Sequence, residues 1–377
     1  MTARADRHDP KPGEVAAWRA RTQRLWGEKH DTPMAAFAHL GAVQSQEYHP
    51  SKLTPAMRSA PGGGPGAFAP PAAVDALIDE GAVIRTHVLR PTWHTVPAAD
   101  IRMMLAATAD RVMRLVGSEL RRLGLDAATL VRSDEALAAA TAGGRGLTRA
   151  EAAEALTAAG VPDAKGQRLG DMLTHAELRS VICSGPSRDG KPTWANFDER
   201  VPAGRIDRED AIRELARRFY TSRGPATLKD FTRWGTLTIA DAKAAIADLD
   251  LASIDLGGRT CYFAGEPPEP SEDGPVVDFV QGFDEMLCSY TDTKDWVLHH
   301  TLPIAKAAER PRCNSAILLD GQLVGHWKAT VKAEKVVIES YRHRGFTADE
   351  IAATRRGADR LRAWYGKDEM ELGLDRA

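Results

Sequence analysis

The stretch "LTRAEAAEALTAAGVPDAKGQRLGDMLTHAELRSVICSGPSRDGKPTWANF", residues 147–197, contains the signals of a complete structural unit. Thr148 and Glu151 have the spacing of a capping box, in which the hydroxyl and the carboxylate each satisfy a free backbone N–H at the start of a helix. A second helical pattern follows after a short turn, and Asp189-Gly190 is a strong hairpin turn between two strands. The stretch therefore predicts helix, turn, helix and hairpin, which is the plan of a winged helix.

The same plan occurs on both sides of this unit. Upstream, the helical pattern "VDALIDEGA" leads into "VIRTHVLRPTWHTV", residues 83–96, where β-branched residues recur at strand spacing and Pro91 fits a turn or an edge. Downstream, Thr227 and Asp230 begin another pair of helices, which is followed by "ASIDLGGRTCYF", residues 252–263, with a Gly-Gly turn. The pattern alone leaves a second interpretation open, because helix pairs followed by hairpins also occur in α+β proteins that never contact DNA.

Beyond residue 275 the pattern changes, after a linker at residues 270–277. Asp320 and Gly321 centre a hairpin, a further strand follows, and a capped helix lies near the end of the chain. We therefore predict an α+β fold with three tandem winged helix-turn-helix units and a β-rich C-terminal domain with a terminal helix. The predicted boundaries are 1–118, 119–203 and 204–275 for the three units and 276–377 for the last domain.

The composition is that of a soluble globular protein, and we expect it to be cytoplasmic. No apolar run reaches the roughly 18 residues of a membrane span, and the N-terminal residues are too polar for a secretory signal. The cysteines are single and far apart, so they predict neither a disulfide framework nor a zinc site. They are Cys183, Cys261, Cys288 and Cys313.

The charge of the chain is unevenly distributed. A net charge of −2 argues against a protein coated in basic residues for indiscriminate nucleic-acid binding. Residues 241–285 are strongly acidic, whereas arginines and lysines concentrate between residues 85 and 122 and between residues 306 and 344. We therefore expect local basic surface, and the acidic segment is a candidate site for a protein partner.

Three further motifs carry little chemical signal. The glycine-rich residues 61–68 lack a following Gly-Lys-Ser/Thr, so they predict a surface loop rather than a phosphate-binding loop. His299 and His300 adjoin each other without a carboxylate-histidine spacing, and we interpret them as solvated or close to DNA rather than as metal ligands. Ser45 has no partner motif for a catalytic triad.

An apolar helical pattern ends at "AVQSQEYHPSK", residues 42–52, which presents Gln44 and Gln46 one residue apart. Neither amide can ionise, so neither can be a strong acid, base or nucleophile. Two interpretations fit this pair. It is either a polar helix end or a site that works by hydrogen bonds rather than by proton transfer.

Taken together, these motifs resemble the AlkZ/YcaQ-type DNA glycosylases, a winged-helix family that removes alkylated bases. The resemblance covers most of the chain, and the order and spacing of several strings carry it. They are "AVQSQ", "RTHVLRPTWHTVPAADIR", "LTRAEAAEAL", "GQRLGDMLTHAELRSVICSGP", "RGPATLKDFTRWGTLT", "QGFDEMLCSYTDTKDWVL" and "LLDGQLVGHWK". The resemblance implies three winged helices that form a concave cradle, followed by a β-rich domain.

The resemblance also implies the catalytic residues. The family signature is glutamine, an apolar residue, and then glutamine or aspartate, and it falls on Gln44, Ser45 and Gln46. The second glutamine places the chain in the double-glutamine, AlkZ-like branch. Ser45 departs from the signature because it is polar, which puts the local packing in question.

Residues near the first hairpin and in the last domain are candidates for contact with DNA. Many relatives carry Arg-Gly-Thr-Leu-His where this chain has "RPTWH", residues 90–94, so Pro91 and Trp93 depart from the family string. Phosphate contacts come mainly from basic side chains and weaken with salt. The hairpin at Asp320-Gly321 is a candidate probe of the minor groove. The residues that we expect to contact DNA are Arg85, Arg90, Thr92, His94, Lys328 and Lys332.

A site built from two amides suits one class of substrate. A purine alkylated at N7 is already cationic, so its departure from the sugar needs no strong general acid, and positioning a water with oriented dipoles is sufficient. We therefore expect a monofunctional DNA glycosylase that needs no cofactor or metal and acts as a monomer on double-stranded DNA containing alkylated purines. The lesion is a methyl adduct, a bulky adduct or an interstrand crosslink. The alternative is a non-catalytic winged-helix DNA-binding protein or transcription regulator, although regulators usually dimerise.

Overall fold

The computed structural model describes residues 10–61, 67–268, 274–299 and 315–374. Four features singled out in the sequence lie outside the described residues, namely glycine-rich residues 62–66, linker residues 270–273, His300 and Cys313. Within the described ranges the fold is a mixture of helices and strands. No helix of these ranges is both long and apolar enough to cross a membrane.

One order of elements occurs three times: a helix, a single strand or bridge, two helices and a two-stranded hairpin. The first repeat (residues 33–97) contains α2 (Pro33–Leu40), β1 (Val43–Gln44), η1 (Pro50–Lys52), α3 (Leu53–Ala56), α4 (Pro71–Glu80), β2 (Val83–His87) and β3 (Trp93–Pro97). The second (residues 127–196) contains α6 (Ala127–Thr141), α7 (Arg149–Ala158), α8 (Gly166–Leu178), β4 (Ile182–Arg188) and β5 (Lys191–Asn196). The third (residues 208–263) contains α10 (Arg208–Arg223), α11 (Leu228–Trp234), α12 (Ile239–Ile246), β6 (Ala252–Leu256) and β7 (Arg259–Phe263).

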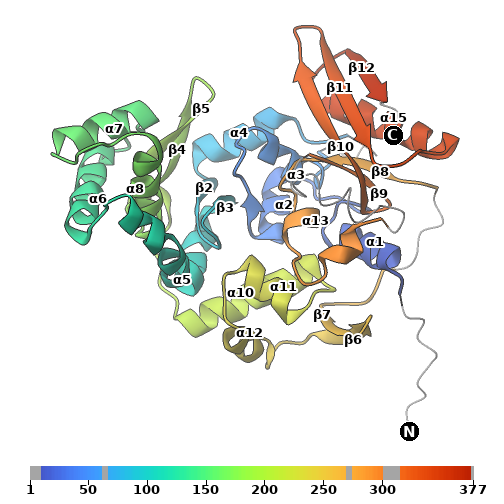
Figure 1. The fold of residues 1–377 in the computed structure, drawn as a ribbon, viewed down its shortest axis with the longest axis horizontal. Coiled ribbons are helices and arrows are strands. Elements are labelled where there is room, and N and C mark those ends of the chain that lie inside the picture. Colours follow the sequence, from blue (N-terminus) through green and yellow to red (C-terminus); the bar gives the residue numbers. More distant parts are fainter. Residues whose placement is uncertain (1–9, 62–66, 269–273, 300–314, 375–377) are drawn as a thin grey trace.

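The pairing of the strands is also the same in the three repeats. In the first, β1 pairs with β3, the second strand of the hairpin, and gives the sheet order β1-β3-β2. Isolated bridges take the place of β1 in the others: Leu147 pairs with Trp194 of β5, and Ala226 pairs with Tyr262 of β7. Figure 1 shows the first repeat in blue at the centre, the second in green to the left and the third in yellow below.

The local signals in the sequence are confirmed. The predicted capping boxes at Thr148 and Thr227 start α7 and α11, with the hydroxyl and the acidic side chain each accepting a backbone N–H. Asp189 and Gly190 have φ angles of 51° and 70°, which is the left-handed backbone that a tight hairpin turn needs. Pro91 is exposed in the loop between β2 and β3, where its missing N–H disturbs no ladder.

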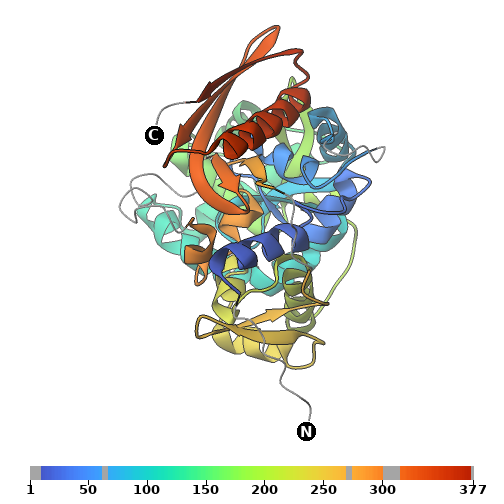
Figure 2. The same cartoon turned by 90° about the vertical axis from the view of Figure 1, so that its right-hand side faces the viewer.

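The C-terminal domain contains one five-stranded sheet. Its order is β12-β11-β10-β9-β8, and only the β11–β12 pair is parallel. Helix α15 packs against β8 and β12. The elements are β8 (Val277–Val280), α13 (Glu285–Cys288), η3 (Lys294–Val297), β9 (Ala316–Leu319), β10 (Gln322–Val331), β11 (Lys335–Arg342), α15 (Ala348–Trp364) and β12 (Glu369–Leu374). The β10–β11 hairpin projects beyond the body of this domain in both views (Figures 1 and 2).

Three further helices and one short 3-10 turn connect these parts. They are α1 (Pro12–Thr22), η2 (Ala98–Asp100), α5 (Ile101–Arg122) and α9 (Phe197–Arg200). Helix α5 packs against α8 of the second repeat and α10 of the third, and its Thr108 hydroxyl donates to Val88 O in the first, so it links all three repeats. Helix α1 lies between the C-terminal domain and the third repeat (Figure 2), where the Arg19 guanidinium donates to Pro225 O and Thr293 Oγ1.

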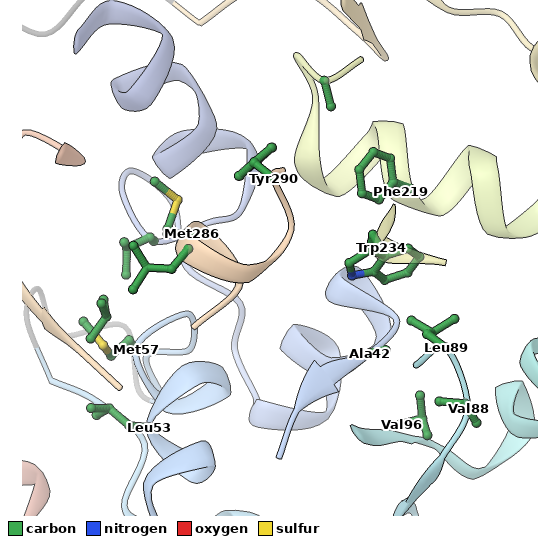
Figure 3. Packing of buried hydrophobic residues seen from close by; sticks show 14 of the residues in the cluster. Ala42, Leu53, Met57, Val88, Leu89, Val96, Phe219, Trp234, Met286 and Tyr290 are labelled. Atoms are coloured by element: carbon green, nitrogen blue, oxygen red, sulfur yellow. The ribbon is translucent and has the colours of Figure 1, made fainter. Parts of the chain in front are cut away.

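The largest hydrophobic core is shared between parts that are far apart in the sequence. It joins the first and third repeats to the C-terminal domain, whereas most of the second repeat packs around a core of its own. Figure 3 shows Met286 and Tyr290, in and just after α13, among side chains from the first and third repeats, including Ala42, Phe219 and Trp234. Burial of α13 therefore holds the start of β1 in a fixed position.

The hairpin at Asp320-Gly321 forms as predicted, and Gly321 in its turn is covered while Asp320 is exposed. A Cβ atom on Gly321 would lie 2.9 Å from the backbone oxygen of Ala16 in α1. The turn is also tied to β8, because Asp320 exchanges two hydrogen bonds with the backbone of Val276. The turn is therefore held against the body of the protein, which argues against the prediction that this hairpin probes the minor groove.

The contact between Gly321 and α1 predicts that a side chain at this position lowers the free energy of unfolding. Gly321→Ala adds a methyl group that meets the α1 backbone, at a φ of +78° that already disfavours side chains, and we expect a loss of about 2–4 kcal/mol. Gly190→Ala is the matched control, because its φ is +70° and nothing lies within 4 Å of the added Cβ. We expect that control to lose about 1–2 kcal/mol in urea unfolding. Equal losses in the two variants would show that α1 does not cover the turn.

Candidate active site

The double-glutamine motif begins on the short strand β1, which contains Gln44, and continues into a bend that contains Gln46. Gln44 pairs with His94 of β3, and the Ser45 N–H continues the ladder with a 2.7 Å bond to Trp93 O. Side chains alternate between the two faces of an extended strand, so the side chains of Gln44 and Ser45 point to opposite faces. Gln44 is 6% exposed, whereas Gln46 is exposed.

The Gln44 amide has a fixed orientation. Its Oε1 accepts a 3.0 Å hydrogen bond from Arg90 Nη2. A guanidinium has only donors, so the atom that faces Arg90 must be the carbonyl oxygen and not the amide nitrogen. The N–H2 of Gln44 is therefore directed away from Arg90. The backbone N–H of Gln44 donates to Glu285 Oε1 at 3.0 Å, which anchors the main chain as well.

Arg90 and His94 form the surroundings of this amide. Arg90 Nη1 donates to Cys288 O at 3.2 Å, and Arg90 Nη2 lies 3.2 Å from His94 Nε2. His94 Nδ1 lies 2.9 Å from the backbone oxygen of Thr92, so Nδ1 carries the proton and Nε2 accepts. Burial lowers the pKa of His94 well below its usual value, and the Arg90 guanidinium acts in the same direction. The ring is therefore neutral at neutral pH.

A second arginine holds the backbone around Gln46. Arg85 Nε donates to Ser45 O at 2.9 Å, and Arg85 Nη2 donates to Gln46 O at 3.4 Å. The guanidinium stacks on the Trp93 ring with its carbon 4.3 Å from the ring centre. Arg85 is 7% exposed, and burial lowers its pKa to about 10, so it stays charged at neutral pH.

The polar residue inside the motif has its own partners. Ser45 Oγ donates to Val43 O at 3.0 Å and lies 2.7 Å from Thr95 Oγ1. Neither contact involves the side chain of Gln44 or Gln46. A hydroxyl in place of the aliphatic group that the family signature expects is therefore satisfied by hydrogen bonds and leaves the two amides undisturbed.

Glu285 holds the main chain of Gln44 in place, and the sequence did not predict it as a site residue. Its Oε2 accepts from Arg223 Nη2 at 2.8 Å and from Ser289 Oγ at 2.6 Å, while its Oε1 accepts from Gln44. Burial alone would raise the pKa of this carboxyl, but the guanidiniums of Arg223 and Arg90 bring it down to about 2. Glu285 is therefore an ionised hydrogen-bond acceptor at neutral pH.

Arg223 connects the third repeat to the same place. It is 0% exposed, and its Nη1 and Nη2 donate to the backbone oxygens of Leu40 and Ala42, at 2.7 Å and 3.0 Å. These two carbonyls immediately precede β1. A parallel arrangement lies next to it, where Asp284 accepts two hydrogen bonds from the buried Arg58. The adjacent acids at the start of α13, Asp284 and Glu285, thus bind one arginine from the first repeat and one from the third.

This burial changes the interpretation of the acidic segment 241–285. Asp278, Asp284 and Glu285 are each 2% exposed or less, and all three form ion pairs with arginines inside the protein. They cannot contribute to a surface for a protein partner. In the sequence, the only sign of this cluster was the pair of adjacent acids, Asp284 and Glu285. The sequence does not reveal that arginines are their partners.

Glu177 of α8 joins the first repeat to the second in the same way. Its Oε2 accepts the His87 N–H at 3.0 Å and lies 2.6 Å from His87 Nδ1. Its Oε1 accepts from the indole N–H groups of Trp93 and Trp194, at 3.3 Å and 2.7 Å. Trp93, which departs from the family string, is therefore fixed between Glu177 and Arg85.

The two predicted lysines lie away from this cluster. Lys328 is exposed on β10, 3.8 Å from Glu339, and Lys332 is exposed just beyond β10 in the projecting hairpin. Lys328 also borders a cleft of about 200 Å³ between the first repeat and the C-terminal domain. Pro50 and Leu53 line its first-repeat side. Among the described residues, no group of three or more His, Cys, Asp or Glu side chains could hold a metal ion.

Comparison with known proteins identifies the family. The sequence model described as "DNA glycosylase AlkZ-like" matches residues 37–364, which is most of the chain. No curated protein matches. Among solved structures, the Streptomyces sahachiroi DNA glycosylase AlkZ is similar, with a TM-score of 0.77 and 21% sequence identity over 98% of this chain and 100% of that one. That likeness shows a shared fold, and the match of the family model confirms the resemblance seen in the sequence. The chain belongs to the AlkZ-like DNA glycosylase family, whose activity is the hydrolysis of N-glycosyl bonds in DNA.

Proposed function

We propose that this protein is a monofunctional DNA glycosylase that releases cationic N7-alkylated purines from double-stranded DNA, with a water positioned by Gln44 and Gln46. One observation carries the proposal. The carboxylate that hydrogen-bonds to the motif is that of Glu285. It accepts hydrogen bonds from Arg223, Ser289 and the Gln44 N–H, and these surroundings lower its pKa to about 2. Such a group cannot donate a proton to a leaving base at neutral pH.

The positive charge of the substrate takes the place of the general acid that the site lacks. A base alkylated at N7 carries a positive charge, so it accepts the electron pair of the breaking bond without prior protonation. The remaining task is to place a water against the anomeric carbon and to favour the developing positive charge on the sugar, which oriented amide dipoles can do. Neutral damaged bases lack this built-in electron sink and should be poor substrates.

The three repeats support a winged-helix architecture. Helix, strand, two helices and a hairpin, with the first strand paired to the last, is the order of elements in a winged helix. We propose that the three repeats, residues 33–97, 127–196 and 208–263, are such units and form a cradle for one duplex, followed by the β-rich domain. The boundary predicted between residues 118 and 119 falls inside α5, so the first unit ends before this helix or includes all of it. A monomer that needs no cofactor and acts in the cytoplasm fits this arrangement.

We propose different roles for the residues predicted to contact DNA. Lys328 and Lys332 are exposed, and they are the candidates for phosphate contacts, which should make affinity fall as salt rises. Arg85, Arg90 and His94 have partners inside the protein, and Thr92 supplies a carbonyl to His94. We propose that these four support the glutamines.

A panel of duplexes tests the proposed function. Each duplex carries one lesion: N7-methylguanine, a bulky N7 adduct, an N7 interstrand crosslink, or the neutral base hypoxanthine as control. We expect release of at least one cationic base and none of hypoxanthine, measured as free base by mass spectrometry. The panel also decides between adduct sizes. Duplex binding without release of any base would support the alternative, a non-catalytic DNA-binding protein or regulator.

A further inference from the structure

We infer that Arg90 is a positioning residue that gives the two glutamines different roles, with Gln44 donating a hydrogen bond to the attacking water and Gln46 accepting one from it. The inference rests on the proposed function and adds to it a division of labour and a third residue. It follows from the contacts of one guanidinium, described below.

Arg90 selects one of the two orientations of the Gln44 amide. An unrestrained glutamine can turn its oxygen or its nitrogen toward a reaction site, because the two ends have nearly the same shape. The 3.0 Å bond from Arg90 Nη2 to Gln44 Oε1 removes this freedom, since a guanidinium cannot accept a bond from the N–H2. The end that stays available to a substrate is then a donor.

The guanidinium is itself held by two further acceptors. Cys288 O binds Nη1 at 3.2 Å, and the neutral His94 ring offers Nε2 to Nη2 at 3.2 Å. His94 can accept because its Nδ1–H is committed to Thr92 O. Three acceptors in fixed directions match the planar fork of arginine, and a lysine ammonium cannot reproduce this geometry.

Gln46 takes the opposite hydrogen-bonding role, that of an acceptor. Its side chain is exposed, and the contact of Arg85 is with its backbone oxygen, so the Gln46 amide remains free to present its carbonyl. A water that accepts a bond from Gln44 Nε2 and donates one to Gln46 Oε1 keeps one lone pair for the sugar. This lone pair forms the bond to C1′, while the C1′–N9 bond breaks with its electron pair going to the cationic purine, which becomes neutral. The proton of the attacking water passes to solvent.

A direct phosphate contact is the competing role for Arg90, which is only partly buried. The two roles predict different results for a lysine. A phosphate contact needs mainly positive charge, so Arg90→Lys would keep activity and affinity. Positioning needs the fork, so Arg90→Lys should lower the rate of the chemical step and leave DNA affinity unchanged.

The experiment measures single-turnover release of N7-methylguanine from a duplex with enzyme in excess. We expect Arg90→Lys to be about 10- to 100-fold slower, with the dissociation constant within about twofold of wild type. Arg90→Met removes the charge, and under positioning it should leave the slope of log Kd against log salt unchanged. Arg111→Lys is the matched control, because Arg111 also donates to a backbone oxygen, that of Thr236, and should keep the wild-type rate.

Two further variants test whether Arg90 acts through Gln44. In a Gln44→Ala background, Arg90→Lys should cause no additional loss, because the group that it positions is gone. Gln44→Glu keeps an acceptor for Arg90 but has no N–H, so it should be as slow as Gln44→Ala. Thermal melting of each variant confirms that it is folded.

The outcomes separate this inference from the proposed function. Loss of rate by Arg90→Lys equally in both backgrounds, an active Gln44→Glu, or a salt slope that falls by about one in Arg90→Met would overturn the positioning role. If wild type releases base and Arg90→Lys matches it, the inference fails while the proposed function stands. If wild type releases no base from any alkylated duplex, the proposed function itself fails.

Discussion

Replacing Gln44 and Gln46 together by alanine is expected to abolish base release and to leave DNA binding largely intact. Loss of one preorganised hydrogen-bonding group in an active site typically costs a factor of about 10²–10³ in rate, and this variant removes two. Neither side chain is a basic group, so the dissociation constant for an N7-methylguanine duplex should change by less than about threefold. The measurement is single-turnover release of the free base.

The control for this pair is an exposed glutamine elsewhere in the chain. Gln167 lies at the start of α8 and bonds only within that helix, to Asp171. Gln167→Ala should keep the wild-type rate. A double variant of Gln44 and Gln46 that releases base as fast as wild type would restrict the two glutamines to a structural role in and after β1.

Replacing Glu285 by alanine should have the largest effect on stability. The variant leaves the Arg223 guanidinium, which is fully buried, without its carboxylate, and breaking such a pair costs about 3–5 kcal/mol. It also removes the acceptor of the Gln44 N–H. We therefore expect the fraction that remains folded to release base more slowly than wild type. Urea unfolding measures the first effect and single-turnover release the second.

Glu339→Ala is the matched control for this loss. Glu339 lies 3.8 Å from Lys328, and both side chains are well exposed. Exposed pairs of this kind contribute about 0–1 kcal/mol, so the control should unfold almost as wild type does. A Glu285→Ala variant as stable as Glu339→Ala would contradict the buried network that we describe around β1.

The sequence predicts the parts of this fold that depend on near neighbours. Capping boxes at Thr148 and Thr227 and the turn at Asp189-Gly190 involve residues at most three apart, so their chemistry can be read from one short string. The three repeats follow from such signals in succession. The sequence also shows that Gln44 follows an apolar helix, but not that it lies on a strand paired with β3.

The sequence does not predict which charges meet across the fold. Glu285 and Arg223 are 62 residues apart, and Arg58 and Asp284 are 226 apart. No local period links such residues, because tertiary packing brings them together. The acids therefore looked like acidic surface.

Long-range packing also explains the revised roles in the first hairpin and in β9–β10. Arg85 was expected at DNA because arginines usually lie at the surface, but Trp93 and the backbone of Ser45 enclose it. Turn chemistry correctly placed a hairpin at Gly321. It carried no information about α1, which covers that turn.

The most direct test of base release by a glutamine-positioned water uses a duplex that contains N7-methylguanine. Mass spectrometry measures the free base that the wild-type protein releases under single-turnover conditions. We predict that the base appears at least about 10²-fold faster with wild type than with the Gln44→Ala, Gln46→Ala double variant. We also predict that no base appears from a duplex with hypoxanthine. Binding of the alkylated duplex by wild type with no release of base would contradict this mechanism.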